Sequence, residues 1–496
     1  MSSYTNSLHC LLQALPGARV VGETDIDIKM IDCDSRSISD GGLFVAINGG
    51  EEQDRHDFVR DAVTSGAVAV VVERAVAEID GVTTIEVEDC RDALAVLASR
   101  FFAEPASCLC NIGVTGTNGK TTTAMLIRAI VDYAGQPGGY IGTLGCLING
   151  EMTPLANTTP EASVLHRELR AMVDAGLSVA VIEVSSHALV LRRVSGIEFD
   201  VAVFTNLSRD HLDFHQTEER YFAAKRSLFD QLKPVDNSRA VVNLDDPFGS
   251  KLIVDLGASA LTYGRHCQAD VRLVCVDTTR EGMKMVLDTP WGEICVKTVL
   301  TGDFNCSNVM AAIACALALG IDPHVASEGL ACFEGIPGRF ERVDAGQSFD
   351  VIVDYAHTPA GLETVLKTAR ELTDKKLICL FGCGGDRDVG KRSEMGRIAS
   401  ELADVVFLTS DNPRSEQPER IIDQITAGMA DATNAFACPD RHEAIGRAIQ
   451  IAEESDVVVL AGKGSENYQI FAGHTVDFDD RLVAREWLEC LFDEGS

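Results

Sequence analysis

A glycine-rich segment that ends in a lysine and two threonines is the strongest chemical signal in the sequence. It is Gly113-Val-Thr-Gly116-Thr-Asn-Gly119-Lys120-Thr121-Thr122, between an apolar run and a helix-like run. The backbone N–H groups of such a turn and the start of the helix attract a phosphate, and a lysine adds a mobile positive charge. The Thr121 hydroxyl is placed to bind Mg²⁺. Because the glycine spacing departs from the strict phosphate-binding loop, the alternative is a turn that binds nothing.

Glu183 and His211 each follow an apolar run and could contribute to a metal site. Transfer of a phosphoryl group to a carboxylate brings anions together, so metal ions and cationic groups must offset the repulsion. The alternatives are a helix-capping or surface carboxylate for Glu183 and a structural histidine for His211. Lys225 lies beside Arg226 in a helix-like segment, and from the residues alone it is a solvated lysine.

A second candidate site follows an apolar run nearer the C-terminus, where the chain continues as Asp411-Asn412-Pro413-Arg414. Loops after the strands of an α/β sheet are where ligands bind, and an arginine can hold a carboxylate through two hydrogen bonds. The alternative is a proline turn with an incidental arginine.

Three more polar side chains have both a functional and a structural interpretation. Asn305 and Asn308 lie at the start of an alanine-rich run, where they could cap a helix or contact a ligand. Arg339 could bind an anion, or it could pair with Glu341 or Asp354.

The elements that must position these residues are predicted from apolar runs and their periodicity. Short runs of Val and Ile without alternation are typical of strands covered on both faces, as in parallel sheets; they lie at 110–115, 178–184, 199–206 and 239–244. A more polar, alternating stretch near 261–300 predicts antiparallel strands. After residue 337 strands and helices alternate, which predicts right-handed βαβ units in a doubly wound sheet.

The fold class predicted from these patterns is α/β. The pattern of apolar runs changes near residues 106 and 336, and this change predicts three domains: 1–106, 107–336 and 337–496. Each domain is long enough to bury a core of its own.

The chain of 496 residues is acidic, with 43 Lys and Arg against 75 Asp and Glu and a formal charge of −32. This balance argues against nucleic acids and anionic membranes as partners, because binding them requires Lys and Arg to neutralise phosphates. The 16 cysteines lack a zinc-binding spacing, and we expect reduced thiols that act as small buried hydrophobes. With no targeting segment and no membrane-spanning stretch, we expect a cytoplasmic protein.

The loop Gly116-Thr-Asn-Gly-Lys-Thr-Thr122 resembles that of the ATP-dependent Mur ligases and of their relative, folylpolyglutamate synthetase. The resemblance covers essentially the whole chain. It implies an N-terminal domain that binds a UDP-linked substrate, a central ATPase domain with a P-loop-type sheet, and a C-terminal Rossmann-like domain that binds an amino acid. It also implies amide-bond formation through an acyl-phosphate intermediate.

Within the family the chain is similar to members that add meso-2,6-diaminopimelate to UDP-N-acetylmuramoyl-L-alanyl-D-glutamate in peptidoglycan synthesis. The resemblance implies catalytic roles for Lys120, Glu183, His211, Lys225 and Arg339. It implies two Mg²⁺ ions held by Thr121, Glu183, His211 and Lys225, with Lys225 carbamylated by CO₂. The residues implied for ATP are Gly116, Thr117, Asn118, Gly119, Lys120, Thr121, Thr122, Asn305, Asn308, Arg339, Asp354 and His357.

The resemblance also implies the residues that bind the two other substrates. For the UDP-linked dipeptide they are Ser35, Asn157, Thr158, Thr159, Ser185 and Arg193; for the amino acid they are Arg387, Asp411, Asn412, Pro413, Arg414, Gly462 and Glu466. The chain has Ser465 where a common family form has His, which we expect to tune the site. All expected partners are small molecules, and we expect a monomer.

Three alternatives remain at this point. A lysine-adding homologue would not need Arg414 at the side-chain end of its amino acid. Folylpolyglutamate synthetase shares the loop but should lack the uridine-binding segment and the Asp411–Arg414 motif. A nucleotide-dependent switch would use the loop without ligase chemistry.

Overall fold

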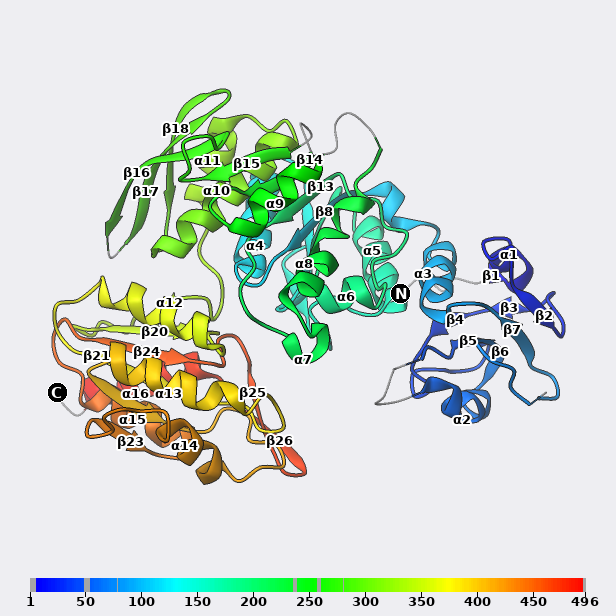
Figure 1. The fold of residues 1–496 in the computed structure, drawn as a ribbon. Coiled ribbons are helices and arrows are strands. Elements are labelled where there is room, and N and C mark those ends of the chain that lie inside the picture. The colour runs from blue at the N-terminus through cyan, green and yellow to red at the C-terminus, as the bar shows by residue number, and fades with distance from the viewer. Residues whose placement is uncertain are drawn as a thin grey trace. The chain divides into compact units, whose positions relative to one another are not determined.

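The structure, a computed structural model, describes residues 6–48, 54–77, 79–234, 239–256, 260–279 and 281–493. The chain divides into two compact units. The first consists of Met1–Val274, Leu287–Ile294 and Asn308–Leu330, and the second of Cys275–Val286, Cys295–Ser307 and Ala331–Ser496. Figure 1 shows the elements of both units along the chain.

A five-stranded sheet near the N-terminus has the order β2-β7-β6-β5-β4. Its strands are β2 (Arg19–Val21), β4 (Met30–Asp32), β5 (Gly42–Val45), β6 (Ala67–Val72) and β7 (Thr83–Glu86). All neighbours are parallel except β2, which is antiparallel to β7. The helices of this segment are α1 (Leu8–Leu12), α2 (Val59–Thr64) and α3 (Cys90–Phe101), with a short 3₁₀ turn at Arg55–Phe58 and the small strand pair β1 (Asn6–Ser7) and β3 (Asp27–Ile28).

The largest sheet has eleven strands in the order β11-β10-β9-β12-β8-β13-β14-β15-β16-β17-β18. Its parallel centre consists of β9 (Gly138–Gly142), β12 (Val179–Glu183), β8 (Cys110–Thr115), β13 (Val201–Phe204), β14 (Arg239–Asn243) and β15 (Ala260–Gly264). The remaining strands are β10 (Gly145–Ile148), β11 (Glu151–Thr153), β16 (Val271–Thr279), β17 (Gly282–Thr289) and β18 (Gly292–Thr298).

Helices connect and cover this sheet. They are α4 (Lys120–Tyr133), α5 (Ala162–Asp174), α6 (Ser186–Val190), α7 (Leu212–His215), α8 (Glu218–Arg226), α9 (Pro247–Leu256), α10 (Asp303–Ala318) and α11 (Pro323–Ala331), with 3₁₀ turns at Pro105–Cys108 and Phe229–Gln231. None of the helices in the described part of the chain is both long enough and apolar enough to cross a membrane.

A six-stranded sheet near the C-terminus has the order β19-β20-β24-β21-β22-β23. Apolar clusters lie on both of its faces, one with α12, α13 and α14 and the other with α15 and α16 (Figure 1). The doubly wound arrangement is therefore confirmed. Its elements are β19 (Glu341–Arg342), β20 (Asp350–Asp354), α12 (Pro359–Arg370), β21 (Leu377–Phe381), α13 (Gly390–Leu402), β22 (Val405–Leu408), α14 (Pro418–Thr426), β23 (Ala435–Ala437), α15 (Arg441–Gln450), β24 (Val457–Ala461), the hairpin β25 (Tyr468–Phe471) and β26 (His474–Asp477), and α16 (Asp480–Asp493).

Two expectations from the sequence need correction. The stretch expected to be antiparallel begins with β15, which pairs in parallel with both β14 and β16. The pairing of β15 with β14 follows from α9, which lies between them, because a crossover through a helix joins parallel strands. The cysteines are all free, as expected, but seven of them are exposed, so burial holds only for part of the set. The α/β class is confirmed, while the boundaries near residues 106 and 336 stay predictions.

Candidate active site

The glycine-rich loop lies between β8 and α4, so the predicted strand–loop–helix arrangement is present. Gly116 and Gly119 have φ values of +149° and +83°. A Cβ atom on Gly116 would lie 1.8 Å from Thr205 Oγ1, and one on Gly119 would lie 2.3 Å from Asn308 Oδ1. The loop therefore requires glycine at both positions for conformation and for close packing.

The residues Thr205 and Asn206, which the sequence analysis missed, hold this loop. Thr117 N donates to Asn206 O at 2.8 Å, and Asn118 N donates to Asn206 Oδ1 at 2.9 Å. Thr205 Oγ1 donates to Asn118 O at 2.6 Å. These contacts fix the shape of the loop before any ligand binds. The residues Gly119 to Thr122, at the start of α4, lie at the positive end of the helix dipole, which attracts an anion.

Lys225 is buried, with 1% of its surface exposed, so the interpretation as a solvated lysine is wrong. Its Nζ atom donates to Gly116 O at 2.7 Å and lies 4.4 Å from the centre of the Tyr221 ring. Lys120 Nζ donates to the same carbonyl oxygen at 3.0 Å. Burial lowers the pKa of the Lys225 amine well below its usual value, and the positive charge of Lys120 lowers it further. The geometry therefore favours a neutral amine at Lys225.

Glu183 ends β12 and is fully buried, which excludes a surface carboxylate. Its carboxylate accepts hydrogen bonds from the Tyr140 hydroxyl, from Thr143 N at 3.1 Å and from Thr143 Oγ1 at 3.2 Å. It is not the cap of the next helix, because Ser185 accepts from Ala188 N there. Tyr140 and Thr143, neither of which had a local signal in the sequence, therefore orient this buried carboxylate.

Several residues expected to bind the UDP-linked dipeptide gather around the end of β12. Thr159 Oγ1 donates to Glu183 O at 2.7 Å and accepts from Ser185 N at 3.0 Å. Arg193 NH1 donates to Thr159 O at 3.0 Å. Thr158 Oγ1 lies 3.1 Å from Thr143 Oγ1, which in turn donates to the Glu183 carboxylate.

Two other residues expected to bind the dipeptide, Asn157 and Ser35, take no part in the hydrogen bonds just described around the end of β12. Asn157 is exposed, next to Thr158 in the chain, and Ser35 is half-buried in the turn after β4. Ser35 follows a strand of the five-stranded sheet, whereas Thr159 and Ser185 lie beside the end of β12 in the eleven-stranded sheet, so the expected dipeptide-binding residues lie next to strands of two sheets of the first unit.

His211 lies just before α7 with a φ of +53°. Its ring packs edge-on against His187, with 4.8 Å between the ring centres, and Nε2 lies 3.4 Å from Asp210 Oδ2. Burial lowers the pKa of His211, which favours the neutral imidazole that a metal ion needs. Within the described ranges, no three His, Cys, Asp or Glu side chains meet in a metal-binding group. Within these ranges, such side chains alone therefore do not make up a Mg²⁺ site, and hydroxyl oxygens or a modified side chain would have to complete one.

Asn305 and Asn308 lie inside α10, which begins at Asp303, so neither is its N-cap. Asn308 Oδ1 accepts from Thr123 Oγ1 at 3.3 Å, which connects α10 to the helix after the glycine-rich loop. Asn305 Nδ2 donates to Thr301 O at 2.8 Å. The expected ATP contacts of both residues stay predictions.

In the second unit, the Arg339 guanidinium lies 4.6 Å from the centre of the Tyr355 ring. The Asp354 carboxylate accepts from Phe340 N at 2.7 Å and from Ala356 N at 2.8 Å. Burial raises the pKa of Asp354, while Arg339 opposes that shift. Asp354 thus fixes the backbone next to Arg339, and His357, which is exposed, follows at the end of the same segment.

The loops after β21 and β22 bring Arg387 and Arg414 together. A Cβ atom on Gly384 would lie 3.0 Å from Arg414 NH1 and 3.7 Å from Arg387 Cγ. Arg414 NH1 donates to Gly385 O at 2.9 Å, and a Cβ on Gly385 would lie 1.9 Å from Pro413 O. The arginine of the Asp411–Arg414 motif is therefore part of a two-loop arrangement, not an incidental member of a turn.

Two carboxylates, those of Asp411 and Glu466, lie close to Asn412 and Gly462. Asn412 Nδ2 donates to Glu466 Oε2 at 2.9 Å, and a Cβ on Gly462 would lie 3.0 Å from Asp411 Oδ2. Lys463, which is fully buried and was missed from the sequence, donates to Glu466 Oε2 at 3.0 Å. Lys463 thus pairs with one of the two carboxylates, Glu466, and the second carboxylate, Asp411, leaves the cluster with an excess of negative charge that suits an ammonium group.

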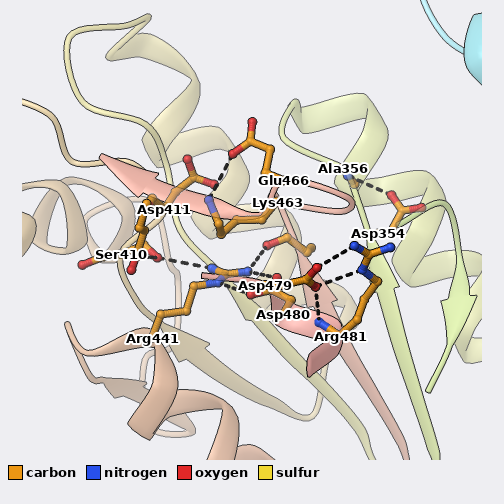
Figure 2. A network of polar contacts seen from close by, with 12 residues as sticks. Asp354, Ala356, Ser410, Asp411, Arg441, Lys463, Glu466, Asp479, Asp480 and Arg481 are labelled. Atoms are coloured by element: carbon orange, nitrogen blue, oxygen red, sulfur yellow. Dashed lines mark hydrogen bonds and ion pairs between the residues drawn. The ribbon is translucent and has the colours of Figure 1, made fainter. Parts of the chain in front are cut away.

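A buried ion pair holds the backbone next to these carboxylates. The Arg441 guanidinium binds the Asp480 carboxylate through Nε at 2.7 Å and NH2 at 2.6 Å, and both side chains are fully buried. Arg441 also donates to Ser410 O at 3.3 Å and to Ala461 O at 3.0 Å, the residues before Asp411 and Gly462. Figure 2 shows Arg441 facing Asp480, with Asp411, Lys463 and Glu466 nearby. The pair therefore holds the carboxyl ends of β22 and β24, the strands on either side of β21.

Family models match three successive segments of the chain. They are the Mur ligase family, catalytic domain, over residues 27–102; the Mur ligase middle domain, over 114–316; and the Mur ligase, glutamate ligase domain, over 338–464. The UDP-N-acetylmuramoyl-L-alanyl-D-glutamate--2,6-diaminopimelate ligase of Geobacillus kaustophilus is 46% identical over 96% of this chain and 98% of its own length.

Solved structures agree with this match. A structure of a UDP-N-acetylmuramoyl-L-alanyl-D-glutamate--2,6-diaminopimelate ligase has a TM-score of 0.69 and 33% identity, and covers 99% of each chain. The MurF ligase of Thermotoga maritima in complex with ADP has a TM-score of 0.63 and 21% identity, covers 94% of this chain and 97% of its own, and shows the shared fold.

Proposed function

We propose that this chain, which belongs to the Mur ligase family, is the ATP-dependent ligase that adds meso-2,6-diaminopimelate to UDP-N-acetylmuramoyl-L-alanyl-D-glutamate in peptidoglycan synthesis. The relatives that match over nearly the whole chain are named for this reaction. The expected reaction activates the glutamate carboxylate as an acyl phosphate, and the incoming amine then displaces phosphate.

The choice of amino acid rests on two groups of charged side chains in the second unit, one basic and one acidic. Arg387 and Arg414 both lie beside Gly384, and Asp411 and Glu466 lie close to Asn412 and Gly462. The far end of diaminopimelate carries one carboxylate and one ammonium group. Arginines suit the carboxylate, and the carboxylate cluster suits the ammonium. Lysine carries only the ammonium group and would leave the arginines without a ligand.

At the other end of the reaction we assign the phosphates of ATP to the loop Gly116–Thr122 and the start of α4. ATP supplies the phosphoryl group that activates the carboxylate. Lys120 Nζ now contacts Gly116 O and Thr117 O at 3.0 and 2.8 Å, and it would exchange these for phosphate oxygens. Thr121 and Glu183 offer oxygen atoms, which are the ligands that Mg²⁺ prefers.

We also propose that Lys225 is carbamylated. Its amine is buried with a lowered pKa, and a neutral amine can attack CO₂. A bond forms between Nζ and the carbon of CO₂, and one proton leaves the nitrogen, so the neutral amine becomes a carbamate anion that could bind a second Mg²⁺ together with His211. A carbamate carbon signal after addition of ¹³C-bicarbonate, absent in Lys225→Ala, is the expected result.

The substrates and the family imply a monomer that works in the cytoplasm, where ATP and UDP-linked precursors occur. We assign Asn305, Asn308, Arg339, Asp354 and His357 to the ATP side of the reaction. The UDP-linked dipeptide is assigned to Ser35, Asn157, Thr158, Thr159, Ser185 and Arg193.

The test is an ADP-release assay with the UDP-muramoyl dipeptide, ATP and a panel of amino acids. We expect turnover with meso-diaminopimelate, weaker turnover with its stereoisomers and little with lysine. Preference for lysine would overturn the substrate assignment, and ATP hydrolysis independent of any amino acid would favour the nucleotide switch.

A further inference from the structure

A buried arginine that belongs to none of the expected site residues joins the two loops that carry Arg387 and Arg414. Arg392, on α13, has no exposed surface. Its NH1 and NH2 atoms donate to Glu416 Oε2 and Oε1, each at 2.8 Å, so the two groups face each other fork to fork. NH1 also donates to Gln424 Oε1 at 2.5 Å.

The same guanidinium reaches the first of the two loops directly, because NH2 donates to Gly384 O at 3.0 Å. Glu416, which belongs to the second loop, accepts from Asp386 N in the first loop at 2.7 Å. Asp386 in turn accepts from Ser415 N at 3.1 Å and from Ser415 Oγ at 2.7 Å. Arg392 and Glu416 are therefore the centre of a set of hydrogen bonds that ties one loop to the other.

The two loops need such support, because their backbones are strained next to the arginines. Asp386, which precedes Arg387, has a φ of +54°, and Arg414 itself has a φ of +53°. Side chains other than glycine adopt this region at an energetic cost, and they persist there when the surroundings hold them. A loop released from these contacts would relax and carry its arginine away.

We propose that Arg392 and Glu416 are a positioning pair that sets the distance and orientation of Arg387 and Arg414 for the side-chain carboxylate of the incoming amino acid. In this proposal neither Arg392 nor Glu416 contacts the substrate, and both act through Arg387 and Arg414. This inference rests on the proposed function, because it assumes that these arginines bind a carboxylate. It makes the pair a determinant of selectivity for diaminopimelate over lysine.

The test measures the KM for diaminopimelate and kcat at saturation in Arg392→Met, Arg392→Lys and Glu416→Gln. We expect the KM to rise by about tenfold or more in Arg392→Met, the factor for one lost charge-assisted hydrogen bond, with a smaller rise in the two conservative variants. We expect kcat and the KM for the UDP-linked dipeptide to stay within about twofold, because only binding of the side-chain carboxylate is weakened. Selectivity over lysine should fall by the same factor as the KM rises.

The matched control is Arg370→Met. Arg370, the last residue of α12, also binds a carboxylate, Asp404, at 2.5 Å and a backbone carbonyl, Lys375 O, at 2.8 Å. These partners precede β22 and β21, so they lie at the amino ends of the strands, whereas the loops of Arg387 and Arg414 follow the carboxyl ends. We expect this variant to keep the wild-type KM for diaminopimelate. Thermal unfolding of every variant shows which of them are folded, and Glu416→Gln, which keeps its shape, decides the matter if Arg392→Met does not fold.

A mutant cycle separates action through Arg387 and Arg414 from general damage. In a background that carries both Arg387→Ala and Arg414→Ala, Arg392→Met should add little to the KM, because both groups that it positions are already gone. Full additivity, an unchanged KM in folded Glu416→Gln and Arg392→Lys, or an equal rise in the KM for the UDP-linked dipeptide would overturn the inference. Wild-type protein that does not use diaminopimelate would instead overturn the proposed function, so the two failures are distinguishable.

Discussion

The first and second units bury basic side chains in different ways. In the first unit Lys225 is buried against a backbone carbonyl and the Tyr221 ring. In the second unit Arg392 and Arg441 are buried against the carboxylates of Glu416 and Asp480. All three side chains have almost no exposed surface. The difference lies in what each buried cation has as its partner.

The chemistry of the two side chains explains this difference. A lysine can lose its proton when burial disfavours the charge, whereas arginine stays charged at every accessible pH. A buried lysine without a carboxylate therefore becomes a neutral amine that can react, and a buried arginine requires a carboxylate and becomes a rigid support. Burial in the first unit favours a neutral amine at Lys225, and burial in the second unit pairs charges that hold loops in place.

The largest expected effect is on the supporting pair. Arg441→Met should leave Asp480 buried without its partner and destabilise the second unit by about 3–5 kcal/mol. Thermal and urea unfolding measure the loss. The double replacement Arg441→Met with Asp480→Leu should recover most of it, because no unpaired charge remains. Equal stability of the single and double variants would show that the charges are not what the pair contributes.

The next effect concerns the reactive amine. Lys225→Ala should lower ADP release with diaminopimelate by about 100-fold or more, since loss of one preorganised charge-stabilising group has that size. Added formate or acetate should restore part of the activity if a carboxylate is what the modified lysine supplies.

The matched control for this variant is Lys233→Ala. Lys233 lies in the same unit and pairs with Asp200 at 2.7 Å near the surface, with 25% of its side chain exposed. We expect this variant to keep its activity. Full activity in Lys225→Ala would remove Lys225 from the mechanism and weaken the contrast between the units.

A smaller effect is expected from another unpaired basic group of the first unit, His166 on α5. Its ring is fully buried, and neither nitrogen has a hydrogen-bond partner within the described ranges. Burial lowers the pKa of His166 to about 4 from the usual 6.5. As pH falls below 6.5 the unfolded chain takes up a proton that the folded chain refuses, so stability present above pH 6.5 is lost towards pH 4.

The unfolding midpoint at pH 7.5 and pH 5 checks this prediction. We expect a loss of about 2 kcal/mol at pH 5 that His166→Leu removes, from the pKa difference and 1.36 kcal/mol per pH unit. His324→Leu, at an exposed position in the same unit, is the control and should keep the wild-type dependence on pH. The same slope in His166→Leu as in wild type would assign the loss to other groups.

The smallest expected effect is a gain in stability. Because the pKa of Lys225 is lowered in the folded state, the unfolded chain holds the proton more tightly at neutral pH, and the lysine therefore costs stability there. Lys225→Met should stabilise the first unit by about 1 kcal/mol while removing activity. A less stable Lys225→Met would indicate that the native amine is charged and well paired.

The glycine-rich loop and the parallel strands around it could be predicted from the sequence, because their signals are local. The apolar run before Gly116, the glycines and the helix after Lys120 lie within a short stretch. Glu183 was also found this way, since it ends an apolar strand. The resemblance to the family then supplied candidates, such as Arg387, that local pattern alone would not single out.

The supporting residues could not be found in the same way, because their partners are distant in the chain. Arg441 and Asp480 are 39 positions apart, and Arg392 and Glu416 are 24 apart. One local signal exists for Arg441: it opens α15, where the helix dipole disfavours a cation. A charge in an unfavourable local position indicates a partner elsewhere, but not which one.

The sequence by itself determined the alternation of strands and helices after residue 337, the glycine-rich loop and the membership of the family, because periodicity and motifs depend on neighbours in the chain. Only the tertiary structure decided that Lys225 is buried beside Gly116 and that Arg392 joins the loops of Arg387 and Arg414. Burial and charge pairing depend on segments that meet in space. For an ionisable side chain, that meeting determines whether it is a solvated charge, a reactive amine or a support.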